Sequence, residues 1–363
     1  MKKILLISTN ADEAGAPRHV EFIVNLLNKD VDFYCVFGSK GPVFQRLDRL
    51  LPNKVLELAG MESSINLLKD LGIFMKFLKM VQEIKPEIIH CHSAKAGILG
   101  RLLSFFLNVK VIYTIHGWPW REFNGFKYKL IIYIEKFLIK YSKCSYIGVA
   151  ECLREEALDV GIDLGLSDFV VIHNSVLQHE PEEENVIYPE DEFIIMPARV
   201  SAAKNHYLLA EAYDMSEFEG NLVFAGQDTD KAEFKSKIMT LTPNKYHKIS
   251  FLGQRSDIGR LINLSSFVCL CSHFETFPLT IVESFAVGKP VIASNVGGNK
   301  EIIDHKYNGL IAQDLEEWKE SLNFLNIKSH RDTISNNSIT TFNQSFHPSL
   351  SRDKFLDVYN GLS

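Results

Sequence analysis

Two glutamates eight positions apart, Glu275 and Glu283, are the strongest candidates for chemistry in this sequence. Between them lies Pro278, a residue suited to the start of a helix. The first amides of such a helix, near Leu279 and Thr280, are free to bind a diphosphate. Glu283 follows about one and a half turns later, and its carboxylate can accept two hydrogen bonds from a ribose. Glu275 precedes the helix in a loop and is placed to meet a sugar.

Two cations five positions apart, Arg199 and Lys204, follow the apolar run Phe193–Met196. In a loop at the carboxyl end of a strand, two such cations can hold a diphosphate from two sides. A diphosphate gains negative charge as it departs, so these cations would stabilise the transition state more than the ground state. The sequence therefore predicts a site for a diphosphate leaving group.

Short apolar runs alternate with segments of helical period, and this alternation must position the two pairs. In the first half, strands are expected at Lys3–Ser8, Val31–Phe37, Lys54–Leu58, Glu87–Cys91, Lys110–Ile115, Ser145–Val149 and Phe169–Ile172. In the second half, they are expected at Phe193–Pro197, Asn221–Ala225, Lys248–Leu252, Phe267–Cys271, Pro290–Ser294 and Gly309–Ala312. Continuous apolar strands that alternate with helices predict parallel sheets covered on both faces.

An acidic stretch with two prolines separates the two series of strands. Its composition is typical of a solvated linker, which we place at residues 178–192. This predicts an N-terminal Rossmann-like domain at 1–177 and a C-terminal Rossmann-like domain at 193–351. Two such domains, facing each other across a cleft, would bind ligands at the carboxyl ends of both sheets.

The N-terminal domain offers a loop and a histidine at the expected cleft edge. Gly15 and Ala16 follow the first strand and leave room for the close approach of an acceptor or of the donor phosphate. His116 ends the strand at Lys110–Ile115; a lone histidine is usually structural, but this position and the glycine after it favour a role in a site. The first loop lacks the glycine-rich dinucleotide fingerprint, which argues against an NAD-dependent dehydrogenase.

Composition is that of an ordinary globular protein. The chain has 363 residues, of which 46% are hydrophobic, and its formal net charge of -6 does not favour nucleic-acid binding. Its six cysteines show no paired metal-ligand spacing, as expected for free thiols in a reducing compartment. The apolar run Ile4–Ile7 is too short for a secretory signal, and no stretch is long enough to span a bilayer. We therefore expect a cytoplasmic protein.

Asp228 and Asp230 form an Asp-x-Asp motif of the kind that binds metal in another transferase architecture. A three-residue match carries little information, and the motif follows an expected strand. We interpret it as a solvated turn and expect no required metal.

Residues 126–143 predict a basic amphipathic helix. Lys129, Lys136, Lys140 and Lys143 fall on one face, and apolar side chains fall on the others. Such a helix can rest on anionic lipid. The protein would then bind peripherally to the inner face of the plasma membrane. The alternative is a surface helix with a solvated lysine stripe, and the sequence leaves both open.

Together these residues resemble the family 4 glycosyltransferases, retaining enzymes of the GT-B fold, over nearly the whole chain. Glu275 and Glu283 resemble the E-x7-E motif of the family, and Arg199 with Lys204 its arginine–lysine pair on the donor diphosphate. Three further segments resemble family motifs: Val171–Asn174, Val296–Gly298 and Asn308–Leu310. Two others resemble the subgroup that builds bacterial surface polysaccharides: His92–Arg101 and Thr114–Trp118.

The resemblance implies transfer of a hexose or N-acetylhexosamine from a nucleotide sugar to a lipid-linked glycan, in capsule or O-antigen biosynthesis. UDP is favoured over GDP as the nucleotide, and neither a cofactor nor a metal is implied. The anomeric configuration would be retained without a protein nucleophile, because the leaving diphosphate helps to deprotonate the acceptor hydroxyl. A C-terminal helix at about 352–363 is expected to pack back on the N-terminal domain.

The implied active site is divided between the domains. Its catalytic residues would be Glu275, His116, Arg199 and Lys204. The donor would be bound by Arg199, Lys204, Gly253, Glu275, Phe277, Pro278, Leu279, Thr280 and Glu283. The acceptor side would hold Gly15, Ala16 and His116. The sequence departs from the family at Thr276, where glycine is usual, and in the glycine-poor loop around Gly15.

Two other functions are compatible with the same fold. A nucleotide-sugar epimerase would convert the donor without any acceptor. A catalytically silent subunit would bind nucleotide or a membrane-bound transferase, and it would need none of the expected site residues. A glycosidase that uses Glu275 and Glu283 fits less well, because hydrolysis needs no phosphate clamp.

Overall fold

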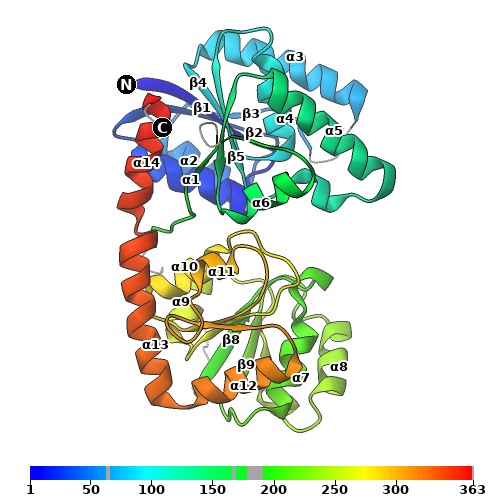
Figure 1. Cartoon of the computed structure of the whole chain (residues 1–363), viewed down its shortest axis with the longest axis vertical. Helices are drawn as coiled ribbons and strands as arrows, with labels where there is room; N and C mark the ends of the chain where they lie inside the picture. Colours follow the sequence, from blue (N-terminus) through cyan, green and yellow to red (C-terminus); the bar gives the residue numbers. More distant parts are fainter. Residues whose placement is uncertain (63–65, 166–168, 178–190, 362–363) are drawn as a thin grey trace. The chain divides into compact units, whose positions relative to one another are not determined.

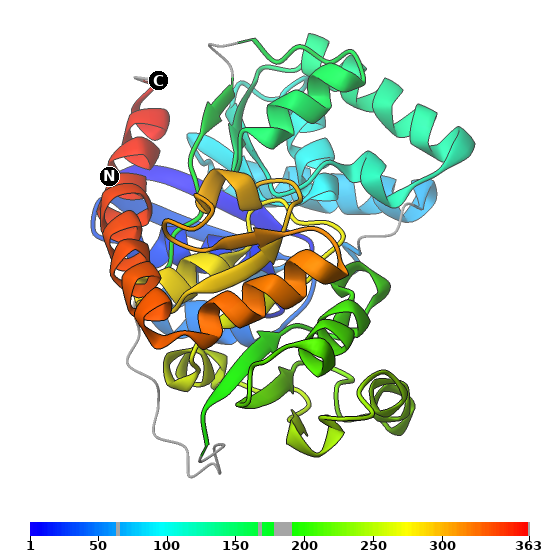
Figure 2. The ribbon, with the colours of Figure 1, turned by 60° about the horizontal axis from the view of Figure 1, so that its bottom comes forward.

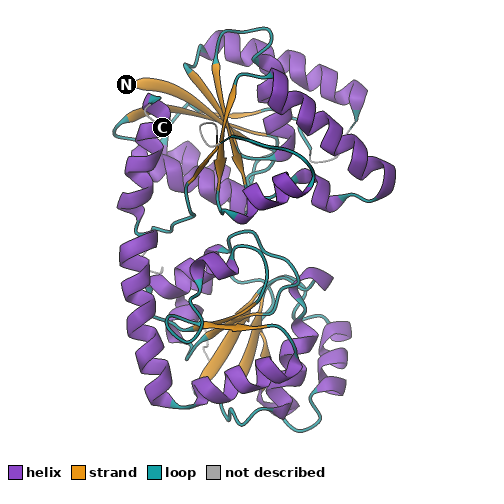
Figure 3. Ribbon diagram, viewed as in Figure 1, coloured by secondary structure: helices purple, strands orange, loops and turns teal. Residues whose placement is uncertain are grey.

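The chain folds into two compact units. The computed structural model describes residues 1–62, 66–165, 169–177 and 191–361. Met1–Asn174 and Pro348–Ser363 form unit 1, and Ser175–His347 form unit 2. Each unit has one sheet with helices on both of its faces (Figure 3). Most of the expected linker, residues 178–190, lies outside the described residues.

Unit 1 is built on a seven-stranded parallel sheet in the order β3-β2-β1-β4-β5-β6-β7. Its strands are β1 (Lys2–Ser8), β2 (Val31–Phe37), β3 (Val55–Glu57), β4 (Ile88–Cys91), β5 (Lys110–Ile115), β6 (Cys144–Gly148) and β7 (Phe169–Val171). Its helices are α1 (Gly15–Leu27), α2 (Pro42–Leu50), α3 (Leu67–Ile84), α4 (Ala94–Leu103), η1 (Pro119–Glu122), α5 (Gly125–Tyr141), α6 (Cys152–Asp159) and α14 (Pro348–Asn360).

The strand order of unit 1 creates a switch point between β1 and β4. From β1 the chain moves through α1 and α2 toward β3, then returns by α3 to β4 and continues the other way. Because parallel crossovers are right-handed, the helices before and after this reversal cover opposite faces of the sheet. Figure 1 shows α1 and α2 on one side of the sheet and α4 and α5 on the other. The carboxyl edge beside β1 and β4 is therefore where such a sheet binds ligands.

The C-terminal helix α14 packs against α1 within unit 1 (Figure 1). Lys2 Nζ donates to the carbonyl oxygen of Tyr359 at 2.9 Å, and Arg352 lies 2.8 Å from the carboxylate of Asp30. The helix begins at Pro348, earlier than the residue 352 expected from the sequence. Proline fits the first turn because its missing amide hydrogen needs no partner there.

Unit 2 is built on a six-stranded parallel sheet in the order β10-β9-β8-β11-β12-β13. Its strands are β8 (Phe193–Pro197), β9 (Asn221–Ala225), β10 (Ile249–Phe251), β11 (Val268–Leu270), β12 (Val291–Ser294) and β13 (Leu310–Ala312). Its helices are η2 (Ala202–Lys204), α7 (His206–Met215), α8 (Ala232–Leu241), η3 (Tyr246–Lys248), α9 (Ile258–Leu264), α10 (Leu279–Ala286), α11 (Asn299–Ile302), α12 (Leu315–Asn326), α13 (Lys328–Thr341) and η4 (Phe342–Phe346).

The same reversal occurs in unit 2, with its switch point between β8 and β11. Helix α12, orange in Figure 2, packs against α7 on one face of the sheet. Trp318 of α12, Tyr213 of α7 and Phe224 of β9 are fully buried in this core. Within each unit, the switch point fixes where loops from distant parts of that unit's sequence meet.

The α/β architecture expected from the sequence is confirmed. Each described strand begins and ends within one residue of its expected position. The strands could be located because they are continuous apolar runs, buried on both faces by the helices that alternate with them. Among the described residues, no helix is both long and apolar enough to cross a membrane.

Candidate active site

The loops after β8 and β11 meet at the switch point of unit 2. Lys204 Nζ contacts Glu275 Oε1 in an ion pair that stays partly open, with 26% and 12% of the two side chains exposed. Ser272 Oγ donates to the same carboxylate oxygen at 2.7 Å. The amide of His273 donates to the carbonyl oxygen of Ala203 at 2.8 Å. Two of the predicted catalytic residues are thus brought together, on loops tied to each other through their backbones.

The loop of Glu275 is also held by the glycine pair that follows β12. Gly297 has φ +47°, in the region that favours glycine, and a Cβ atom there would overlap the carbonyl oxygen of Glu275. Its neighbour Gly298 has φ -73° and caps the short helix α11. Of the two glycines, Gly297 is the one that needs both the positive φ and the close approach.

Arg199 is exposed in the loop that leads from β8 to Lys204. Within the described part of the chain it forms no ion pair, so its guanidinium is available to a ligand. Its backbone is braced by Gly226, where a Cβ atom would overlap the carbonyl oxygen of Ala198. The amide of Gly226 donates to the carbonyl oxygen of Gly253 at 2.7 Å. Through Gly226, Gly253 is therefore linked to the loop of Arg199.

Helix α10 starts at Leu279 with Pro278 as its N-cap. Leu279, Thr280 and Glu283 are all half-buried. The capping proline presents no side-chain hydrogen bond, so the first amides of the helix stay available to a ligand. The helix therefore starts at the residue that the sequence predicted.

Phe277 turns away from any such ligand. Its side chain is 5% exposed and packs inside unit 2, with its ring centroid 5.8 Å from that of Phe346. Only its backbone is therefore placed to serve the donor-binding role expected of it. The neighbouring Thr276 is buried without a positive φ, which explains how a β-branched residue is tolerated where the family usually has glycine.

The Asp-x-Asp motif lies in the turn after β9. Asp228 has φ +70° and its carboxylate lies 2.8 Å from Lys231 Nζ. Thr229 between the two aspartates is buried and donates to the carbonyl oxygen of Gly226 at 2.9 Å. The two aspartates thus lie in a hydrogen-bonded turn, as the sequence predicted.

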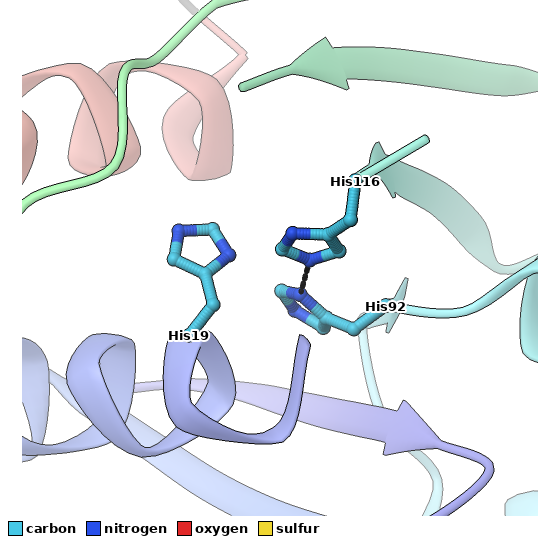
Figure 4. Close-up of side chains that lie close together, drawn as sticks. All are labelled: His19, His92 and His116. Carbon is cyan, nitrogen blue, oxygen red and sulfur yellow. Dashed lines mark hydrogen bonds between the residues drawn. The ribbon is translucent and has the colours of Figure 1, made fainter. Parts of the chain in front are cut away.

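Three histidines gather at the carboxyl edge of the sheet in unit 1, on α1 and after β4 and β5 (Figure 4). The ring centroid of His19 lies 5.4 Å from that of His92 and 4.9 Å from that of His116. Nδ1 of His92 lies 3.4 Å from Nε2 of His116. Gly15 and Ala16 begin the helix that carries His19, so the residues expected on the acceptor side lie around this histidine cluster.

The histidine cluster is uncharged at neutral pH. Burial, followed by repulsion from neighbouring histidines, holds the pKa of His19 and of His92 well below the ordinary value. Burial lowers the pKa of His116 to about 4. Unit 1 therefore presents neutral imidazoles at its carboxyl edge, whereas unit 2 presents charged groups at its own.

A fourth histidine beside the cluster has a plainly structural role. His90 Nδ1 is bonded to the hydroxyl of Tyr359 at 2.8 Å, and its Nε2 to Oγ1 of Thr114 at 2.7 Å. Both ring nitrogens are satisfied, and the first bond ties β4 to α14. His90 and the histidine cluster (His19, His92 and His116) thus differ in how completely their nitrogens are paired.

Helix α5 exposes an apolar stripe on unit 1. Phe126 and Tyr133 are 79% and 71% exposed, and Leu130, Phe137 and Tyr141 continue the stripe at helical spacing. Lys129, Lys136, Lys140 and Lys143 are exposed beside it. On the opposite side of the helix, Glu135 is fully buried against Arg101 of α4. This buried contact fixes the rotation of α5 and keeps the apolar stripe turned outward.

A cavity of about 1000 Å³ lies next to α5. Four lysines line it, namely Lys110, Lys136, Lys140 and Lys143, together with backbone near Gly161. Lys110 and Cys144 are the first residues of β5 and β6, so the cavity lies at the amino edge of the sheet. It is therefore at the opposite edge from the histidine cluster.

Comparison with known proteins places both units in a single class. Residues 14–176 match the model described as Glycosyltransferase Family 4, and residues 178–340 match that of Glycosyl transferases group 1. The chain belongs to glycosyltransferase family 4.

Several relatives of this glycosyltransferase act in polysaccharide assembly. It is 24% identical over 352 residues to the UDP-Gal:alpha-D-GlcNAc-diphosphoundecaprenol alpha-1,3-galactosyltransferase of Escherichia coli, covering 92% of this chain and 90% of that one. It is 23% identical to the capsular polysaccharide biosynthesis glycosyltransferase CapM of Staphylococcus aureus, covering 92% and 91%. The crystal structure of Anabaena Alr3699/HepE with UDP and glucose superimposes with a TM-score of 0.83 at 19% identity, covering 99% and 100%. The GT-B fold expected from the sequence is confirmed.

Two members of the histidine cluster, His19 and His92, are not among the site residues expected from the sequence. His92 ends the run His90-Cys91-His92, whose alternation puts both histidines on one face of the strand. That spacing was a usable signal. His19 carried none, because its approach to His116 depends on packing between residues almost a hundred positions apart.

Proposed function

We propose that this glycosyltransferase moves a hexose or N-acetylhexosamine from a UDP-sugar to a lipid-linked glycan, with retention at the anomeric carbon, in the assembly of a bacterial surface polysaccharide. The observation that carries the proposal is the open Lys204–Glu275 pair at the switch point of unit 2, with Arg199 exposed in the loop that leads to Lys204. The names of the relatives support UDP as the nucleotide and a diphosphate-linked lipid as the acceptor.

Donor binding would exchange the partners of the open pair. Without a donor, Lys204 is held by Glu275. A diphosphate is the stronger partner for Lys204, because it carries more charge and also engages Arg199. The exchange would release the carboxylate of Glu275 to accept hydrogen bonds from the hydroxyls of the donor sugar, while Ser272 keeps it in place. The ion pair would thus hold Lys204 near the site of the diphosphate and Glu275 near the site of the donor sugar until the donor binds.

The remaining donor contacts would come from α10 and from the turn after β10. The amides of Leu279 and Thr280 would meet the diphosphate, and Glu283 would accept hydrogen bonds from the ribose hydroxyls. The backbone at Gly253 would hold the base. Phe277 and Pro278 would contribute through their place at the start of the helix.

The acceptor side would be provided by unit 1. The neutral imidazole of His116, with the open helix start at Gly15 and Ala16, suits an uncharged sugar hydroxyl better than an anion. As the bond between the sugar and the diphosphate breaks, Arg199 and Lys204 would neutralise the charge that develops, so no divalent cation is needed at the phosphates. The departing diphosphate would take the proton of the acceptor hydroxyl on the same face of the sugar, which gives retention.

Membrane contact through α5 is part of the same proposal, because a lipid-linked acceptor lies at a membrane surface. An exposed apolar stripe beside a row of lysines fits an anionic bilayer. Replacing Phe126, Tyr133 and Phe137 by serine should reduce co-sedimentation with anionic vesicles. Serine at the exposed Met239 and Leu264 of unit 2 is the matched control. Equal sedimentation of both variants would contradict membrane contact through α5.

The direct test is turnover with defined substrates. Purified protein would be given UDP-galactose, UDP-glucose, UDP-N-acetylglucosamine or GDP-mannose, with and without a sugar–diphosphate–lipid acceptor and without added Mg²⁺ or Mn²⁺. We expect UDP release that depends on the acceptor, and an axial anomeric bond in the product by NMR. Conversion of the donor without an acceptor would instead support an epimerase. Nucleotide binding without any turnover would support a silent subunit.

A further inference from the structure

The histidine cluster brings three potential metal-ligating nitrogens together, and one of their separations matches that of a tetrahedral metal site. One ring nitrogen from each of His19, His92 and His116 lies within 4.8 Å of the other two. Nδ1 of His92 and Nε2 of His116 are 3.4 Å apart. Zinc–imidazole bonds are about 2.0–2.1 Å long, so two nitrogens on a tetrahedral ion are separated by about 3.4 Å. That separation is long for a hydrogen bond and matches one edge of a zinc tetrahedron.

The nitrogens of this cluster also lack the partners that a structural histidine finds. Both ring nitrogens of His19 and Nε2 of His92 have no hydrogen-bond partner among the residues that the structure describes, although these side chains are at most 2% exposed. His90, whose ring lies 4.1 Å from that of His92, pairs both of its nitrogens. Buried polar atoms left unpaired are costly, so the contrast points to a ligand that the cluster is built to hold.

We propose that His19, His92 and His116 together bind one divalent transition-metal ion, with Zn²⁺ the best match. Three imidazoles suit zinc, cobalt and nickel, whereas Mg²⁺ and Ca²⁺ prefer oxygen ligands. Three protein ligands leave the fourth position to a water molecule or a hydroxyl group.

Such an ion would tie α1 to the ends of two strands, β4 and β5, that are already neighbours in the sheet. His19 comes from the second turn of α1, and the other two histidines follow β4 and β5 (Figure 4). The ion would therefore fix α1 over the switch point of unit 1. The inference adds an ion to the proposed acceptor side, with which it shares His116, whereas the donor diphosphate is assigned to residues of unit 2 and needs no metal.

Cobalt titration of the intact protein tests the site directly. Protein without an affinity tag would be stripped with a chelator, dialysed, and titrated with Co²⁺ while its visible absorption is recorded. We expect one equivalent of Co²⁺ to give the bands of a tetrahedral complex, Zn²⁺ to abolish them, and Mg²⁺ to leave them unchanged. Zn²⁺ should also raise the Tm of the stripped protein, because an ion that binds the native state stabilises it. Absence of the cobalt bands would overturn the proposal.

The variant His19→Phe removes a ligand without threatening the fold. The ring of His19 packs against Phe22 and Phe355, so phenylalanine fits among its neighbours and removes two unpaired nitrogens. We expect it to fold and to lose more than about 100-fold in Zn²⁺ affinity, since changes even outside the ligand shell cost 10–100-fold. His247→Gln, at an exposed histidine of unit 2, is the matched control and should bind Zn²⁺ like the wild type. Unchanged affinity in His19→Phe would show that the cluster is only a packed core.

Discussion

Each unit contains an ion pair of a basic residue and a glutamate, and the two pairs are built in opposite ways. In unit 1, Arg101 and Glu135 are bidentate at 2.7 and 2.9 Å, and neither side chain is exposed. In unit 2, Lys204 and Glu275 remain partly exposed on two loops. The first pair joins helices α4 and α5, whereas the second lies at the carboxyl edge of a sheet. A closed pair serves packing, while an open pair can exchange its partners.

Additional contacts sharpen this difference. Nε of Arg101 donates to the carbonyl oxygen of Gly97 at 2.9 Å, so the guanidinium has partners on several sides. Neither charged group of this pair is open to solvent. Lys204 is bonded to a carboxylate that also accepts from Ser272, so the loss of Lys204 to a diphosphate would leave Glu275 with a partner. The comparison predicts that changes in the closed pair alter stability and changes at the open site alter activity.

The largest expected effect is the loss of stability in Glu135→Ala. Removing this carboxylate leaves the charge of Arg101 buried without its partner, so we expect the free energy of unfolding to fall by about 3–5 kcal/mol. Urea denaturation measures it. In the double variant Arg101→Met with Glu135→Leu, both charges are gone and most of the loss should be recovered. If the double variant is no more stable than Glu135→Ala, the loss of stability does not come from the unpaired charge of Arg101 alone.

Substitutions at the open site should lower the transferase activity and leave stability nearly unchanged. Arg199→Ala and Lys204→Ala should each lower kcat by about 10²–10³-fold, because each removes a group that stabilises the leaving diphosphate. Their free energies of unfolding should stay within about 0.5 kcal/mol of the wild type, as for other surface substitutions. Lys237→Ala, on the surface of α8, is the control and should have wild-type kcat. Wild-type turnover in Arg199→Ala would remove the phosphate clamp from the mechanism.

The sequence predicted the open site better than the closed pair for a physical reason. Arg199 and Glu275 each follow an apolar run, and parallel strands bring their carboxyl ends to one edge, so local pattern was enough to bring the loops together. Arg101 and Glu135 lie on two helices whose relative rotation depends on packing, and nothing in their spacing names one as the partner of the other. The same limit applied to His19. The lysine face of α5 was visible in the sequence, but the outward direction of its aromatic side chains was set by the buried Glu135.

The glycine pair after β12 allows a test of how tightly the open site is positioned. In Gly297→Ala, the added Cβ would overlap the carbonyl oxygen of Glu275, and its φ of +47° is unfavourable for alanine. We expect a loss of about 1–3 kcal/mol in the free energy of unfolding, together with a lower kcat as the Glu275 loop moves. Gly259→Ala, where an added Cβ meets open space on α9, should be neutral or slightly stabilising. Equal behaviour of the two variants would indicate that the Glu275 loop adapts freely.

The smallest expected effect is a dependence of the free energy of unfolding on pH, which arises from His206 next to the loop of Arg199. His206 Nε2 donates to the carbonyl oxygen of Ala198, the residue before Arg199, at 3.1 Å. Burial lowers the pKa of His206 to about 4; the hydrogen bond to Ala198 opposes this shift, and the nearby charge of Lys204 adds a smaller lowering. The imidazole is therefore neutral in the native state, where it supports the loop of Arg199.

The sign of the pH effect follows from comparing His206 in the native and unfolded chains. Between pH 6.5 and about 4 the unfolded chain binds a proton at this position and the native chain does not, so stability falls as the pH falls. His206→Gln keeps an N–H donor but cannot titrate. Relative to it, the wild type should lose up to about 1.4 kcal/mol per pH unit in this window, measured by urea denaturation at pH 7, 6 and 5. The free energy of unfolding of the control variant His247→Gln should change with pH as that of the wild type does. If His206→Gln also shows the wild-type dependence on pH, the acid sensitivity does not arise from His206.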